Sequence, residues 1–243
     1  MSVSDSSPQI TAVLKSQIAR SIQSTLISNT LTSKRWEEHI AQCLKYRFHA
    51  AMIPPCWVKQ TAAVLKGSEV RVASFIDFPL GTMTSTGKVY ETGRLAQDGV
   101  NEIDLMPNVG FLLSGMEREY ADDILAVVKA AGKIPVKIML ELPLLTPEQA
   151  TRAVTLSIDS GVAYLKNASS GAVGVATPEQ IQFLRRLALA NVRVKASGGI
   201  KSASQVQELL AAGAELVGTS AGARIMAELQ GDVQEREQEP SSY

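Results

Sequence analysis

Short apolar runs alternate with longer amphipathic segments along most of this chain, and this alternation constrains the fold more than any other feature. The runs that we interpret as buried strands occupy residues 21–26, 49–53, 70–76, 102–106, 134–142, 162–166, 192–195 and 214–218. Apolar residues recur with helical spacing in segments that lie between them, including residues 120–131, 147–160, 178–190 and 203–212. Strands that alternate with helices form a parallel sheet with right-handed crossovers, so the pattern predicts an α/β fold.

A repeated joint between helix and strand favours a closed barrel over an open sheet. Gly99, Gly161 and Gly213 each stand where a predicted helix ends and an apolar run begins. Glycine suits the left-handed conformation that ends many helices. The matched units predict a (β/α)8 TIM barrel. We expect a single domain over residues 1–230 with an N-terminal helix, followed by a flexible, polar tail over residues 231–243.

The overall composition excludes several classes of partner. Lys plus Arg and Asp plus Glu each number 24, so no global field attracts nucleic acid or an anionic membrane. The N-terminus has no apolar signal core, and no apolar run approaches the roughly 18 residues of a membrane span, which predicts a cytoplasmic protein. Cys43 and Cys56 form no CxxC pair. We interpret both as buried apolar residues rather than as members of a disulfide or a zinc site.

Charged residues within apolar strands are the strongest candidates for chemistry, because burying a charge is costly unless it is paired or serves a site. Five of them stand in or at the ends of predicted strands: Asp104, Lys137, Glu141, Lys166 and Lys195. In barrels of this class the C-terminal strand ends form the active-site face. A neutral lysine there can attack a carbonyl to form an imine, which then draws electrons from the adjacent carbon–carbon bond.

Two lysines on adjacent strands would supply the neutral amine that this chemistry needs. Partial burial and a second nearby cation both lower the pKa of an amine from about 10.4, and Lys166 and Lys195 end consecutive predicted strands. Asp104 would then shuttle protons as a general acid and base. The alternative is that these three side chains only neutralise one another. For Lys137 the corresponding alternative is an interior ion pair with a carboxylate such as Glu141.

Two glycine-rich stretches follow the last two predicted strands and predict a phosphate site. Residues 197–202 read Ser-Gly-Gly-Ile-Lys-Ser, and residues 218–222 read Gly-Thr-Ser-Ala-Gly. Free backbone N–H groups at helix N-termini bind phosphate, and barrels commonly hold phosphate in the loops after their last two strands. The alternative is a pair of tight turns without a ligand.

Taken in order, these residues resemble the deoxyribose-phosphate aldolase family from about Ser21 to Leu229. The most specific matching stretches are residues 78–81, 101–104, 136–138, 164–166, 194–200 and 217–220. The resemblance implies a class I aldolase without a metal or other cofactor, acting in carbohydrate catabolism. Members interconvert 2-deoxyribose 5-phosphate with glyceraldehyde 3-phosphate and acetaldehyde, and they are often homodimers.

The resemblance also implies a role for individual residues. By match of motif, Lys166 forms the imine, Lys195 tunes the pKa of that amine, and Asp104 joins the proton relay. The residues that hold the substrate or its phosphate are Thr25, Gly198, Gly199, Lys201, Gly218 and Ser220. Lys137 is a further candidate, and Tyr243 matches the mobile C-terminal tyrosine that some relatives use.

Four positions depart from the family pattern and concern the substrate rather than the imine. Gln23 and Ser24 precede Thr25 where the family has Asp-His-Thr or Asp-x-Thr, Ser170 replaces a glycine, and Ala221 replaces a serine. These departures leave open a divergent member that performs aldol or related carbon–carbon chemistry on another aldehyde, with or without phosphate. A non-catalytic phosphosugar-binding barrel and a phosphosugar isomerase are the remaining alternatives.

Overall fold

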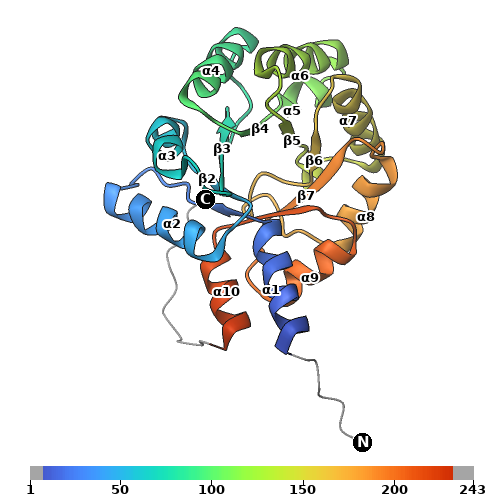
Figure 1. Ribbon diagram of the computed structural model, residues 1–243. Helices are drawn as coiled ribbons and strands as arrows, with labels where there is room; N and C mark the ends of the chain where they lie inside the picture. Colours follow the sequence, from blue (N-terminus) through green and yellow to red (C-terminus); the bar gives the residue numbers. More distant parts are fainter. Residues whose placement is uncertain (1–7, 232–243) are drawn as a thin grey trace, which may run out of the picture.

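Eight parallel strands close into a barrel in sequence order, and helices surround it (Figure 1). The computed structural model describes residues 8–231, with side chains from residue 12 onward. Every strand pairs in parallel with its neighbours, and β1 closes the barrel against β8. The predicted (β/α)8 barrel with an N-terminal helix is therefore confirmed.

The strands are short and the helices longer, as expected for this architecture. The strands are β1 Ile22–Thr25, β2 Ala50–Met52, β3 Arg71–Ile76, β4 Glu102–Leu105, β5 Val136–Met139, β6 Tyr164–Lys166, β7 Arg193–Ser197 and β8 Leu216–Thr219. The α-helices are α1 Pro8–Ser21, α2 Ser33–Tyr46, α3 Val58–Leu65, α4 Ser85–Asp98, α5 Val109–Leu113, α6 Glu117–Ala131, α7 Pro147–Asp159, α8 Pro178–Leu187, α9 Ala203–Ala211 and α10 Gly222–Gln230. Two 3-10 turns, η1 Pro55–Trp57 and η2 Leu142–Leu144, complete the described elements.

Local sequence signals fix several helix ends. Thr146 and Ser202 each form a capping box with the glutamine three residues later, and Thr177 accepts a hydrogen bond from the backbone of α8. Gly99 has a φ of 93° and ends α4 in the left-handed conformation. The three N-caps set where α7, α8 and α9 begin, and Gly99 sets where α4 ends before β4.

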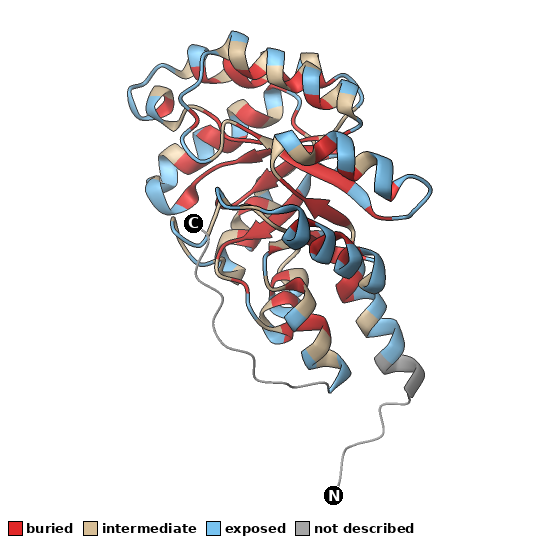
Figure 2. Ribbon diagram, turned by 90° about the vertical axis from the view of Figure 1, so that its left-hand side faces the viewer, coloured by how far each residue is buried: buried red, intermediate tan, exposed pale blue. Residues whose placement is uncertain are grey.

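The apolar core fills the space between the barrel and the helices. Figure 2 shows buried residues along the strands and on the inner faces of the helices, with exposed residues on the outer helix faces. Ile103, Ile138, Leu165 and Val194 come from four successive strands and are fully buried or nearly so. Their neighbours along each strand point the other way, into the barrel, because side chains alternate along a strand. The inward-facing set includes the charged residues.

Three sequence expectations need correction or fall outside the described part. The predicted strand over residues 134–142 is shorter, because Glu141 adopts a left-handed conformation with a φ of 54° and η2 follows. Cys43 is buried as expected, but Cys56 is exposed, since it lies in the η1 turn on the surface. The tail from residue 232 and Tyr243 lie outside the described residues. Within residues 8–231, no helix is long and apolar enough to cross a membrane.

Candidate active site

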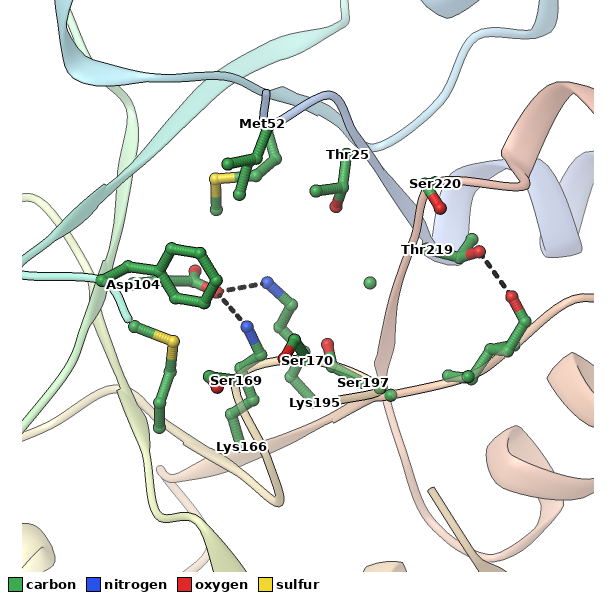
Figure 3. Close-up of a pocket in the computed structure, with 18 of the residues that line it drawn as sticks. Thr25, Met52, Asp104, Lys166, Ser169, Ser170, Lys195, Ser197, Thr219 and Ser220 are labelled. Carbon is green, nitrogen blue, oxygen red and sulfur yellow. Dashed lines mark hydrogen bonds and ion pairs between the residues drawn. The ribbon is translucent and has the colours of Figure 1, made fainter. Parts of the chain in front are cut away.

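A cavity of about 130 Å³ opens at the C-terminal ends of the strands (Figure 3). Its polar and glycine lining consists of Thr25, Asp104, Lys166, Ser169, Ser170, Gly171, Lys195, Ser197, Gly198, Gly199, Lys201, Gly218, Thr219 and Ser220. Its apolar lining consists of Ile27, Met52, Phe75, Phe78, Met139 and Ile200. The cavity therefore has the position and mixed lining of a barrel active site.

Two lysines share one carboxylate at the floor of this cavity. The Nζ atoms of Lys166 and Lys195 lie 3.0 Å and 2.6 Å from the same oxygen, Oδ2 of Asp104 (Figure 3). The strand register explains the meeting of the lysines, because Lys166 and Lys195 are direct neighbours across β6 and β7. Lys166 is 6% exposed, Lys195 1% and Asp104 1%, so the cluster is almost fully buried although all three side chains line the cavity.

Burial and mutual charge shift the ionisation of this cluster. Burial alone raises the pKa of Asp104, but the positive charges of Lys195, Lys166 and Lys137 reverse this and hold that pKa well below its usual range. Burial lowers the pKa of Lys195 well below its usual range, and the nearby lysines add to this while Asp104 opposes it. Asp104 is therefore a carboxylate at neutral pH, and its negative charge opposes the loss of the proton from Lys195.

Gln23, in β1, is the position at which the resemblance leads one to expect an acid. Its side chain is fully buried, and its Oε1 accepts a hydrogen bond from Nζ of Lys195. The amide supplies this contact without adding a second negative charge. Ser24, the other departure in β1, is also buried but does not line the cavity.

Lys137 lies beneath the cluster and does not line the cavity. Its Nζ is 2.7 Å from Oε2 of Glu102 and 3.6 Å from Oδ1 of Asp104. The expected interior ion pair exists, but its carboxylate is Glu102 rather than Glu141. Glu102 stands two residues before Asp104 on β4, so alternation along the strand points both side chains into the barrel. That periodicity was the signal that could have identified Glu102.

Glu141 instead organises the loop after β6. Its Oε1 accepts a hydrogen bond of 2.8 Å from the backbone N–H of Ser169. Asn167, in the same loop, accepts a hydrogen bond of 2.8 Å from the backbone N–H of Ser197. These two bonds tie the loop after β6 to β7 and to the segment that follows β5, and Ser169 and Ser170 lie at the wall of the cavity.

The glycine-rich loops after β7 and β8 continue the wall next to the loop after β6, and every predicted phosphate contact lines the cavity. Gly198 and Gly199 have φ values of 115° and 63°, which disfavour any side chain. A Cβ on Gly198 would overlap the carbonyl oxygen of Gly174, and one on Gly218 would overlap Oγ of Ser197. The backbone can thus approach a ligand closely here.

The apolar wall was not identified from the sequence. Met52, Phe75, Phe78 and Met139 face the cavity beside the lysines, and the rings of Phe75 and Phe78 meet edge to face at 5.3 Å. Strand-end apolar residues have the same pattern as core residues, so no sequence signal separates them. Among the described side chains, no group of three or more His, Cys, Asp and Glu residues is arranged to hold a metal ion.

The chain is similar to proteins named as deoxyribose-phosphate aldolases, although no protein-family model matches it. The relative from Geobacillus sp. (strain WCH70) is 36% identical over 214 residues, which cover 88% of this chain and 96% of the relative. A structure from Coccidioides immitis, assigned to the same activity, has a TM-score of 0.84 and 30% identity over 88% of this chain and 86% of its own. The aldolase from Aeropyrum pernix, described as a unique tetramer, shares the fold with a TM-score of 0.81 at 24% identity, over 93% of this chain and 100% of its own.

Proposed function

The chain belongs to the deoxyribose-phosphate aldolase family, and from this premise we propose that it reversibly cleaves 2-deoxyribose 5-phosphate through an imine on Lys166. The products are glyceraldehyde 3-phosphate and acetaldehyde. One observation carries the proposal: a lysine amine at the cavity wall lies 3.0 Å from a buried carboxylate that also binds a second lysine. A binding protein without catalysis has no need to bury two amines around one carboxylate, which is costly.

The reaction begins with the open-chain aldehyde of the sugar. The neutral amine of Lys166 attacks C1, water leaves, and a protonated imine forms. The bond between C2 and C3 then breaks as the C3 hydroxyl loses its proton and becomes a carbonyl. The electron pair of the broken bond moves to the imine, which gives an enamine. Glyceraldehyde 3-phosphate departs, the enamine takes a proton at C2, and water releases acetaldehyde from Lys166.

The neighbouring groups have complementary roles in this proposal. Asp104 is held as a carboxylate, so it can accept the proton of the C3 hydroxyl through water and return it to C2. Lys195 binds the same carboxylate oxygen as Lys166, and in its protonated form it would disfavour a second ammonium group beside it. Phe75 and Phe78 shield the enamine from water, since they form the apolar wall beside the lysines.

The glycine-rich loops supply the phosphate end. Gly198, Gly199 and Gly218 present backbone at the cavity, while Lys201 and Ser220 add a positive charge and a hydroxyl. Thr25 lines the β1 side of the same cavity, which supports a contact between its hydroxyl and a sugar hydroxyl in this proposal. We infer that Ser170 and the Gln23 substitution adjust which acceptor aldehyde is preferred, because one lines the cavity and the other binds Lys195.

Borohydride trapping tests the assignment directly. Wild-type protein treated with acetaldehyde and borohydride is expected to gain one reduced adduct on Lys166, located by peptide mass spectrometry. Lys166→Ala should lose both the adduct and the cleavage of 2-deoxyribose 5-phosphate, whereas Lys129→Ala, at an exposed lysine of α6, should keep both. Cleavage by Lys166→Ala at more than a few per cent of the wild-type rate would exclude the imine on this residue.

The family assignment also carries expectations about context. We infer a cytoplasmic enzyme of deoxyribose phosphate breakdown that works as a homodimer. The Aeropyrum pernix aldolase, which has the same fold, is described as a tetramer.

A further inference from the structure

A second carboxylate and a third lysine lie on the far side of Asp104 from the cavity. Glu102 and Lys137 are fully buried, and neither lines the cavity, so the steps proposed above do not use them. Glu102 is the first residue of β4, two residues before Asp104, and Lys137 is the direct neighbour of Asp104 across β4 and β5. The pair therefore sits directly beneath the proton-transfer group.

Glu102 is held from the opposite end of the barrel. Its Oε1 lies 2.7 Å from Nε2 of His49 and 2.7 Å from a guanidinium nitrogen of Arg71. Burial raises the pKa of Glu102, but the charge of Lys137 and the contacts from His49 outweigh it and lower that pKa well below its usual range. Glu102 is therefore a fixed negative charge whose other oxygen, Oε2, remains for Lys137.

Lys137 has two carboxylates within reach and lies closer to Glu102. Its Nζ is 2.7 Å from Oε2 of Glu102 but 3.6 Å from Oδ1 of Asp104. Within the described residues, neither Nζ of Lys137 nor Oδ1 of Asp104 makes a hydrogen bond of good geometry. Attraction between charges thus sets the position of this ammonium group, and a change in either carboxylate would move it.

We propose that Glu102 is a positioning residue for the aldolase. By pairing with the ammonium group of Lys137, Glu102 keeps that group from pairing closely with Asp104, so that Asp104 remains bonded to Lys166 and Lys195. Without the charge of Glu102, the nearest carboxylate to Lys137 is Asp104. An ammonium paired closely with Asp104 makes that carboxylate a weaker proton acceptor and competes with the two catalytic lysines for it. This inference rests on the function proposed above.

A double-mutant cycle tests the proposal, because it predicts rescue. Glu102→Gln keeps the size of the side chain and removes its charge, so kcat should fall by at least about tenfold, equivalent to about 1.4 kcal/mol. Lys137→Met in the same chain removes the competing ammonium and should restore kcat to within about threefold of wild type. The pH dependence of kcat should change in the single Glu102→Gln variant and return toward wild type in the double variant.

Controls separate this role from a structural one. Glu117→Gln is the matched control, because Glu117 pairs with Arg152 on the surface and should leave kcat unchanged. Thermal unfolding by circular dichroism reports whether each variant is folded. If Glu102→Gln does not fold, Glu102→Asp replaces it, since the shorter carboxylate withdraws from Lys137, and Lys137→Met should again relieve the loss. A double variant as slow as the single one overturns the proposal.

The outcome also distinguishes this proposal from the assignment of function. If wild-type protein does not cleave 2-deoxyribose 5-phosphate, the substrate assignment fails. The rate at which borohydride traps acetaldehyde on Lys166 then replaces kcat in the same cycle. A loss of trapping in Glu102→Gln that Lys137→Met relieves supports the positioning role. Wild-type protein that neither cleaves the sugar phosphate nor traps acetaldehyde overturns both proposals.

Discussion

Gly198→Ala is expected to weaken binding of the phosphate without affecting the imine. Gly198 has a φ of 115°, and a methyl group there would overlap the carbonyl oxygen of Gly174. Holding a side chain in this region costs about 1–3 kcal/mol, so the loop after β7 must shift away from the loop after β6. A hydrogen bond to a charged group contributes about 1.5–3 kcal/mol, and losing one raises KM for the sugar phosphate roughly 10- to 100-fold.

Two assays on the same variant make this prediction specific. Steady-state cleavage of 2-deoxyribose 5-phosphate gives kcat and KM, and borohydride trapping of acetaldehyde reports the amine of Lys166 alone. Gly93→Ala is the matched control, because this glycine lies in α4 with nothing within 4 Å of an added Cβ. An unchanged KM in folded Gly198→Ala protein would refute the assignment of phosphate to these loops, and lost trapping would show that the imine site itself had moved.

The remaining predictions concern pH. Lys195→Leu removes a neighbouring cation, so the acid side of the cleavage rate profile should move to higher pH; a profile identical to wild type would contradict the role of Lys195. Asp104 and Glu102 have pKa values held below the usual range of about 4, so the stability they contribute is present above that pH and is lost as the pH falls through their lowered values. Urea unfolding at pH 5, 4 and 3 should therefore show a falling free energy of unfolding, with a smaller fall in the Glu102→Gln, Lys137→Met double variant.

The sequence predicted the strand residues of the site better than its surroundings. The proximity of Asp104, Lys166 and Lys195 could be predicted from the sequence. The ends of parallel strands meet at one face of a barrel, and charged residues are rare in apolar strands. Lys137 forms the interior ion pair that was given as an alternative, but Glu141, the example named for its partner, does not take part, because Glu141 was read as part of a longer strand. Its left-handed backbone turns the chain out of β5 before that residue.

Other features depend on packing that no local pattern encodes. Phe75 lies in an apolar run and Phe78 in a stretch noted only for its resemblance to the family, and only the closed barrel shows that both face the cavity. Lys88 was not singled out, yet it is fully buried, with its Nζ 2.7 Å from Asp123 on another helix. This ion pair joins α4 to α6, so it depends on how the two helices pack against each other. The spacing of residues along the chain does not predict that packing.

The division of the site between strands and loops has a consequence for how such an enzyme diversifies. The amines and their carboxylate are fixed by the register of β4, β6 and β7, where a single shift would disturb the whole barrel. The groups that meet the far end of a ligand belong to loops, and Ser170 stands there at a family glycine position. We therefore expect substitutions in these loops to change which aldehyde is accepted, while the lysines and the carboxylate on the strands stay in place.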